Sequence, residues 1–96
     1  MSMHASIEID RRYAEQLQGA AQSLGQLLIW TIYDHPLDYP EWFVARPHII
    51  RPKKTGPVPM HLIATDLNAL RALLPDGLTR LERQPNDDPF ILEVWV

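Results

Sequence analysis

The chain has 96 residues, no cysteine, nine prolines and a formal net charge of −3. A chain of this length forms one hydrophobic core, and therefore one domain. The lack of cysteine excludes a disulfide scaffold, a thiol enzyme and a zinc site with cysteine ligands. Nine Lys and Arg residues stand against twelve Asp and Glu residues, so the mean electrostatic field repels phosphate and weighs against a general nucleic-acid binder.

The sequence shows no segment for membrane insertion or secretion. Its longest apolar run, Leu27–Trp30, is far shorter than the ~20 residues that a membrane-spanning helix needs. The first residues, Met1–Ala5, lack the basic region with which a signal peptide begins. We therefore expect a cytoplasmic protein without a membrane partner.

Apolar residues spaced by three or four predict a helix over residues 6–24. Asp10 is suited to cap the start of this helix, and Gly25 is suited to follow its end. Residues 6–9 also alternate between polar and apolar, so a short strand there is the competing prediction. The apolar positions of the predicted helix are Ile9, Tyr13, Leu17, Ala20 and Leu24.

The remainder of the chain is predicted to contain five strands and a second helix. That helix covers residues 67–74, with Asp66 as its cap. Prolines and aspartates predict loops at 34–40 and 84–89, and three prolines with a glycine predict a loop at 51–59. The predicted strands cover residues 27–33, 42–45 with an extension to 51, 60–65, 78–83 and 90–96.

This order of elements predicts an α+β fold, because strands joined by short connections favour antiparallel pairing. We expect a two-layer sandwich with a mainly antiparallel sheet of about five strands and both helices on one face. Within this single domain, residues 1–26 form an N-terminal helix extension and residues 27–96 form the compact part.

The most concentrated polar segment runs from Tyr33 to Pro40. An aspartate beside a histidine can orient the imidazole, and Asp34, His35 and Asp38 could together supply metal ligands. In the structural interpretation both aspartates bond to nearby backbone amides, and His35 is extended because it precedes a proline. The structural interpretation is preferred, with a binding contact as the first functional alternative.

A second candidate site is basic, because no acidic residue occurs between Glu41 and Asp66. Its charged side chains could form a solvated strand edge, contact an acidic protein partner, or bind nucleic acid with Trp42 available for stacking. Alternation along the strand places Arg46 and His48 on one face. The basic residues are Arg46, His48, Arg51, Lys53 and Lys54.

Acidic residues near the C-terminus form a third candidate. Asp87 and Asp88 lie between prolines and are expected to make turn contacts. Glu93 lies between apolar residues in the last predicted strand, where alternation gives it the same direction as Ile91 and Trp95. A cross-strand partner such as Arg80 or Arg46 would explain an acid at this position.

Two segments together resemble a family of small uncharacterised bacterial proteins. The first is W-T-x-Y-D-H-P-x-D-x-P-x-x-F-V-A-R over residues 30–46, and the second is D-D-P-x-I-x-E-x-W over residues 87–95. The resemblance extends from about residue 29 to residue 96 and implies no established activity, substrate or cofactor. Members of that family tend to begin near the first strand, so the segment before residue 27 departs from their pattern.

No phosphate-binding loop, dinucleotide fingerprint or hydrolase motif is present. The sequence therefore predicts a non-catalytic module that binds a protein partner or pairs with itself, with no cofactor, no bound metal and no catalytic residue assigned. A small metal-binding or hydrolytic enzyme built on Asp34, His35 and Asp38 is one alternative. Nucleic-acid contact through Arg46–Lys54 is the other. The binding candidates are Tyr33, Asp34, His35, Asp38, Trp42, Arg46, His48, Arg51, Lys53, Lys54, Glu93 and Trp95.

Overall fold

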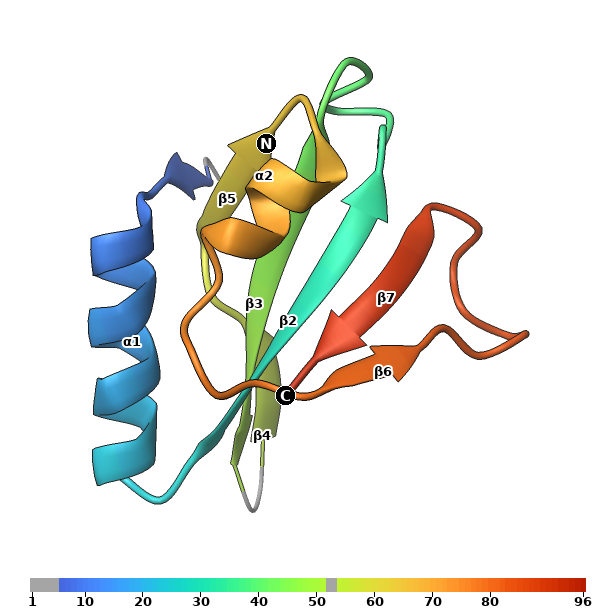
Figure 1. Ribbon diagram of the computed structural model, residues 1–96. Coiled ribbons are helices and arrows are strands. Elements are labelled where there is room, and N and C mark those ends of the chain that lie inside the picture. The colour runs from blue at the N-terminus through green and yellow to red at the C-terminus, as the bar shows by residue number, and fades with distance from the viewer. Residues whose placement is uncertain (1–5, 52–53) are drawn as a thin grey trace.

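A computed structural model describes residues 6–51 and 54–96, in which two helices accompany a sheet of seven strands (Figure 1). The α+β class is thus confirmed. The elements in chain order are β1 (Ile7–Glu8), α1 (Arg11–Ser23), β2 (Leu27–Asp34), β3 (Phe43–Arg51), β4 (Lys54–Pro57), β5 (Met60–Ala64), α2 (Leu67–Ala72), β6 (Arg80–Glu82) and β7 (Ile91–Trp95).

The sheet is mixed and mostly antiparallel. Its strands follow the order β1-β5-β3-β2-β7-β6, and β4 pairs with the outer half of β3. Only β1 and β5 run parallel among the described strands. The sheet has more than the five expected strands because β1 and β4 add to them. β1 confirms the competing prediction of a short strand before the first helix.

β4 lies inside the predicted loop 51–59, so that part of the prediction is wrong. Pro57 is its last residue. Because β4 pairs only with β3, the missing amide hydrogen of Pro57 removes no hydrogen bond from the interior of the sheet. β3 itself continues through Pro47. On that side of β3 the partner changes from β5, opposite residues 43–45, to β4, opposite residues 48–51. The missing amide hydrogen of Pro47 therefore falls where no strand pairs with it.

Both helices begin at the predicted caps. The Asp10 carboxylate accepts a hydrogen bond from the Tyr13 amide at 2.8 Å, and the Asp66 carboxylate accepts one from the Ala69 amide at 2.9 Å. Because Asp10 is the N-cap, α1 starts at residue 11 rather than at residue 6. Gly25, with φ +67°, follows the end of α1 as predicted, since this left-handed conformation favours glycine.

One buried cluster joins both helices to the sheet. Ala14 and Ala21 of α1 and Leu70 of α2 pack with the even-numbered residues 28, 30 and 32 of β2. Trp30 is fully buried, and its indole Nε1 donates a hydrogen bond of 2.9 Å to Oε1 of the buried Gln18. Residues before position 27 therefore supply part of the core.

The register between β2 and β7 contains a bulge. Trp30 lies opposite Trp95 and Ile32 lies opposite Glu93, but the next residue, Tyr33, lies opposite Ile91. Directly opposed residues share a face of the sheet. Ile91 therefore lies on the opposite face from Glu93, and the predicted alternation through this strand is wrong at that residue.

Candidate functional site

The loop after β2 turns sharply at His35, whose φ of +49° contradicts the expected extended conformation. Local contacts hold this turn. The His35 amide donates to the Trp42 carbonyl at 3.0 Å, and its ring Nδ1 lies 2.5 Å from Oδ1 of Asp34. The same ring packs edge-on against Phe43, with ring centroids 4.8 Å apart. Asp34 and His35 thus close the base of the loop.

We call the face of the sheet opposite the buried cluster the Tyr33 face. Strand alternation and register assign the side chains to it. Its members are Leu27, Ile29, Thr31 and Tyr33 of β2, Val44, Arg46, His48 and Ile50 of β3, His61 and Ile63 of β5, Leu81 of β6, and Ile91 and Val94 of β7.

The loop of residues 35–42 folds back over one end of the Tyr33 face. The Asp38 carboxylate accepts a hydrogen bond from Nη2 of Arg46, and the Tyr39 ring lies 5.0 Å from the His61 ring. Val44 is fully buried although it points away from the buried cluster, and His61 is only 2% exposed. This loop therefore covers the end of the face where β3 meets β5.

Arg46 links the loop to the sheet. Its guanidinium carbon lies 5.0 Å from the centre of the Tyr33 ring, a cation–π arrangement. The hydrogen bond from Arg46 lowers the pKa of Asp38, while burial raises the pKa of Tyr33 against the opposing effect of Arg46. Tyr33, Asp38 and Arg46, three predicted binding candidates, therefore form one connected group.

His61 was missed by the sequence analysis. Its Nδ1 lies 2.7 Å from the hydroxyl oxygen of Ser6, and burial lowers its pKa, which favours the neutral imidazole. The signal that could have found it is its position as the polar residue within the apolar run from Met60 to Ala64. Since Ser6 and Tyr39 both contact it, His61 ties the N-terminal segment and the loop to β5.

The predicted triad of Asp34, His35 and Asp38 does not converge. Asp34 bonds to the His35 ring, whereas Asp38 bonds to Arg46, and the prediction of bonds to nearby backbone amides misses both partners. Within residues 6–51 and 54–96 no group of three or more His, Cys, Asp or Glu side chains is arranged to hold a metal ion. Asp34, His35 and Asp38 therefore do not form the common site that the metal-binding or hydrolytic alternative requires.

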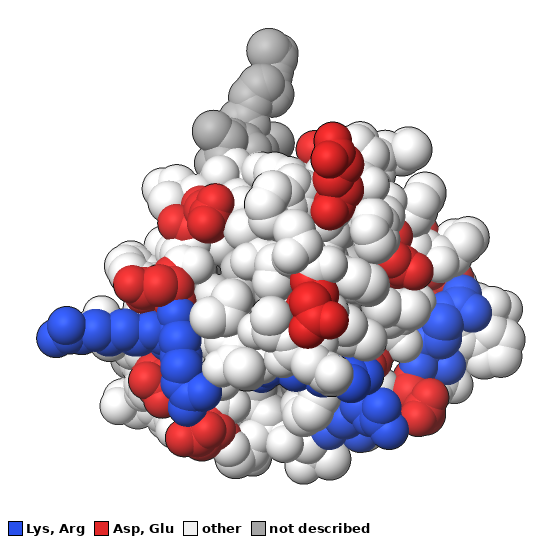
Figure 2. Space-filling model, turned by 45° about the horizontal axis from the view of Figure 1, so that its top comes forward, with Lys and Arg blue, Asp and Glu red and all other residues white. Residues whose placement is uncertain are grey.

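The described residues of the basic stretch have different surroundings. Arg46 and His48 both line a pocket beside β4, Arg46 is also bonded to Asp38, and Arg51 is exposed at the end of β3. Lys54 begins β4, and Lys53 lies outside the described residues. On the face that Figure 2 shows, acidic and basic side chains are interspersed. Trp42 is 38% exposed at the end of the loop.

Glu93 lies on the same side of the sheet as the buried cluster, away from Arg46. Its side chain is 6% exposed and receives hydrogen bonds from Nε of Arg71 at 3.0 Å and from Nη2 of Arg71 at 2.6 Å. The Trp95 indole donates a further bond of 2.6 Å, and Arg80 lies 3.9 Å away. Arg80 was a predicted partner, Arg71 was missed, and the suggestion of Arg46 is wrong because that side chain lies on the other face.

The Arg71–Glu93 pair connects α2 to β7, which places it among structural contacts. Burial alone would raise the pKa of Glu93, but the bonds from Arg71 and Trp95 outweigh this effect and lower it. The neighbouring acids Asp87 and Asp88 accept hydrogen bonds from the backbone amides of Gln84 and Phe90. This confirms the turn contacts expected for them.

A large part of the Tyr33 face is left uncovered by the loop. Leu27 and Leu81 are 49% and 47% exposed, and Ile29, Ile50 and Val94 are half-buried. These apolar side chains come from four strands and lie beside one another in the sheet. Contiguous apolar areas larger than roughly a few hundred Å² are typical of interaction surfaces.

No family model, curated protein or solved structure matches this chain. No helix within the described residues is both long enough and apolar enough to cross a membrane.

Proposed function

We propose that this chain is a small cytoplasmic self-associating protein, and that its Tyr33 face packs against the same face of a second copy. The observation that carries the proposal is the uncovered apolar area of Leu27, Ile29, Ile50, Leu81 and Val94. Burying such side chains between two copies removes apolar surface from water, which is the main favourable term in association.

The arrangement of the helices supports this choice of face. Both helices contribute to one buried cluster with the even-numbered residues of β2. We infer a two-layer molecule in which the helices cover one face of the sheet and leave the Tyr33 face without a helical partner. A sheet with one apolar face uncovered gains stability when a second layer covers it.

The charges on the Tyr33 face also suit a second copy. A two-fold interface places a patch against itself, so a patch with net charge would repel its own copy. Arg46 is paired with Asp38, while Ile29 lies opposite His48 and beside the uncharged Thr31 and Leu27 on the same face. Among the Lys, Arg, Asp and Glu side chains assigned to this face, pairing therefore brings no unbalanced charge together.

The experiment is a charge placed in the centre of the face. Ile29→Lys is expected to convert a dimer into a monomer, because a lysine there must be desolvated on pairing and faces its own copy across the two-fold axis. Size-exclusion chromatography with light scattering measures the mass, and we expect the dissociation constant to rise by about a hundredfold or more.

Ile7→Lys is the matched control. Ile7 is 61% exposed and lies opposite Met60, on the side of the sheet away from the Tyr33 face. This variant should remain dimeric. Leu81→Lys, at a more exposed position of the Tyr33 face, should also weaken pairing with less effect on folding. A wild-type protein that is monomeric at high concentration, or a folded Ile29→Lys variant that is still a full dimer, would contradict the proposal.

A further inference from the structure

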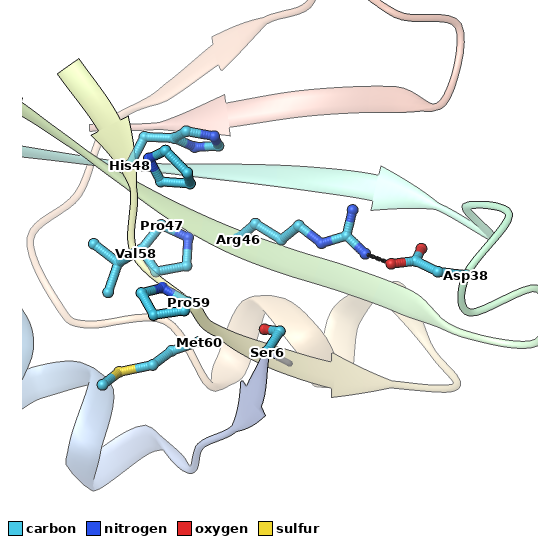
Figure 3. A pocket seen from close by; sticks show the side chains of 9 residues that line it. Ser6, Asp38, Arg46, Pro47, His48, Val58, Pro59 and Met60 are labelled. Carbon is cyan, nitrogen blue, oxygen red and sulfur yellow. Dashed lines mark hydrogen bonds and ion pairs between the residues drawn. The ribbon is translucent and has the colours of Figure 1, made fainter. Parts of the chain in front are cut away.

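A pocket of about 410 Å³ opens beside the middle of β3, where the strand that pairs with β3 changes from β5 to β4 (Figure 3). The chain between those two strands crosses at Val58, whose amide donates to the Pro47 carbonyl at 3.0 Å. The pocket exists because neither strand pairs with the middle of β3. Its volume lies within the range of about 300–1,000 Å³ typical of small-molecule sites.

One wall of the pocket is apolar and rigid. Three of its five residues are prolines, whose rings have a fixed backbone φ and lose little freedom when a ligand packs against them. Figure 3 shows most of this wall gathered beside β3. It is formed by Pro47, Pro57, Val58, Pro59 and Met60.

Arg46 and Asp38 lie toward the other end, where Arg46 extends along β3 to Asp38, whereas His48 lies beside Pro47 (Figure 3). Arg46 is 27% exposed and uses Nη2 for Asp38, and no hydrogen bond from its Nε or Nη1 is found among the described residues. A guanidinium has five N–H donors, so donors remain for a ligand oxygen. Ser6 and His48 complete the polar lining.

The charges of Arg46 and Asp38 cancel, and this determines the class of ligand. An anion would meet the Asp38 carboxylate beside its arginine, and a cation would meet the guanidinium. A neutral group with a carbonyl oxygen can accept from the unused arginine donors, and an amide NH₂ can donate to Asp38 at the same time.

We propose that this pocket binds a neutral small molecule that carries an apolar ring and a primary amide. The ring packs against the proline wall, and the amide lies at the Arg46–Asp38 pair. This inference does not rest on self-association, because one chain supplies every lining residue, although Arg46 and His48 also belong to the Tyr33 face.

Three probes with the same ring test the charge argument: benzamide, benzoate and benzylamine. Binding is followed by NMR through the methyl signal of Met60, which lines the wall, in protein with labelled methionine. We expect saturable shifts at millimolar concentration with benzamide, and binding of benzoate and benzylamine weaker by about tenfold, as expected for the loss of one well-formed hydrogen bond with charge repulsion added.

Arg46→Met should weaken benzamide binding by about tenfold, whereas Arg51→Met should leave it unchanged, because Arg51 is an exposed arginine of the same strand outside the pocket lining. Pro59→Phe places a larger side chain at an exposed position of the pocket wall and should abolish binding even if Arg46→Met proves unstable. The proposal is overturned if none of the probes shifts the Met60 signal, if benzoate or benzylamine binds as well as benzamide, or if a folded Pro59→Phe variant binds normally.

Discussion

Replacement of Trp30 by alanine is expected to lower the free energy of unfolding by about 3–5 kcal/mol, the range for removal of a buried aromatic side chain. Trp30 is fully buried in the middle of β2, where it belongs to the buried cluster that the sheet shares with both helices. Small domains are stable by about 5–15 kcal/mol in total, so this change removes a large share of the stability. Urea denaturation followed by circular dichroism measures it.

Trp42→Ala is the matched control, because Trp42 is 38% exposed in the loop after β2. It should cost less than about 1 kcal/mol, as surface changes usually do. A second variant, Trp30→Phe, retains most of the ring but leaves the Gln18 amide oxygen without its donor. Loss of this hydrogen bond should lower the free energy of unfolding by about 1–3 kcal/mol. Equal effects of Trp30→Ala and Trp42→Ala would contradict the placement of Trp30 in the core.

The second large effect is expected at the Arg71–Glu93 pair. Arg71→Met leaves the carboxylate of Glu93, 6% exposed, without its two strongest donors. Loss of one partner from a fully buried pair costs about 3–5 kcal/mol. Because Arg71 is 31% exposed, we expect a smaller loss of about 2–3 kcal/mol. Urea denaturation at neutral pH measures the change.

A double-mutant cycle separates the pair from its surroundings. The combination Arg71→Met with Glu93→Leu should be less destabilised than the sum of the single changes, with a coupling of about 0.5–3 kcal/mol. The control is Arg11→Met, which breaks the exposed contacts to Asp76, Glu15 and the Ala72 carbonyl and should leave the free energy of unfolding nearly unchanged. Additive single effects at Arg71 and Glu93 would show that the two side chains do not interact.

The pH dependence of this pair has a definite sign. The folded protein lowers the pKa of Glu93 from its ordinary value of 4.5. The stabilisation is therefore fully present above pH 4.5 and is lost as the pH falls through the lower, folded value. The difference in stability between the wild type and Arg71→Met should shrink over that acidic interval. A difference that stays constant from neutral to acidic pH would contradict the ion pair.

Local signals predicted the helix starts well. Asp10 and Asp66 both cap their helices because capping depends on a few neighbouring backbone amides. The α+β class also follows from the order of periodic segments. By contrast, β4 was hidden by its glycine and proline, since its pairing with β3 is a tertiary contact that overrides weak strand propensity.

The contacts that define the candidate site were harder to predict from the sequence. The bulge opposite Tyr33 reverses the direction of Ile91, and nothing in the alternating pattern marks it. The segment after β2 was predicted as a loop, but its return over the sheet depends on contacts with Arg46 of β3 and His61 of β5, which the sequence alone does not reveal. Arg71 is likewise 22 residues before Glu93 in the chain, with β6 between them. Such partners depend on topology rather than on local sequence.

The most direct test of self-association through the Tyr33 face is a dilution series followed by NMR of labelled isoleucine methyl groups. Ile49 and Ile50 are neighbours in β3 but point to opposite faces, and Ile29 shares the Tyr33 face with Ile50. Self-association through this face predicts that dilution shifts the signals of Ile29 and Ile50 while the signal of Ile49 stays in place. Signals of Ile29 and Ile50 that do not depend on concentration, in a protein that light scattering shows to be monomeric throughout, would contradict it.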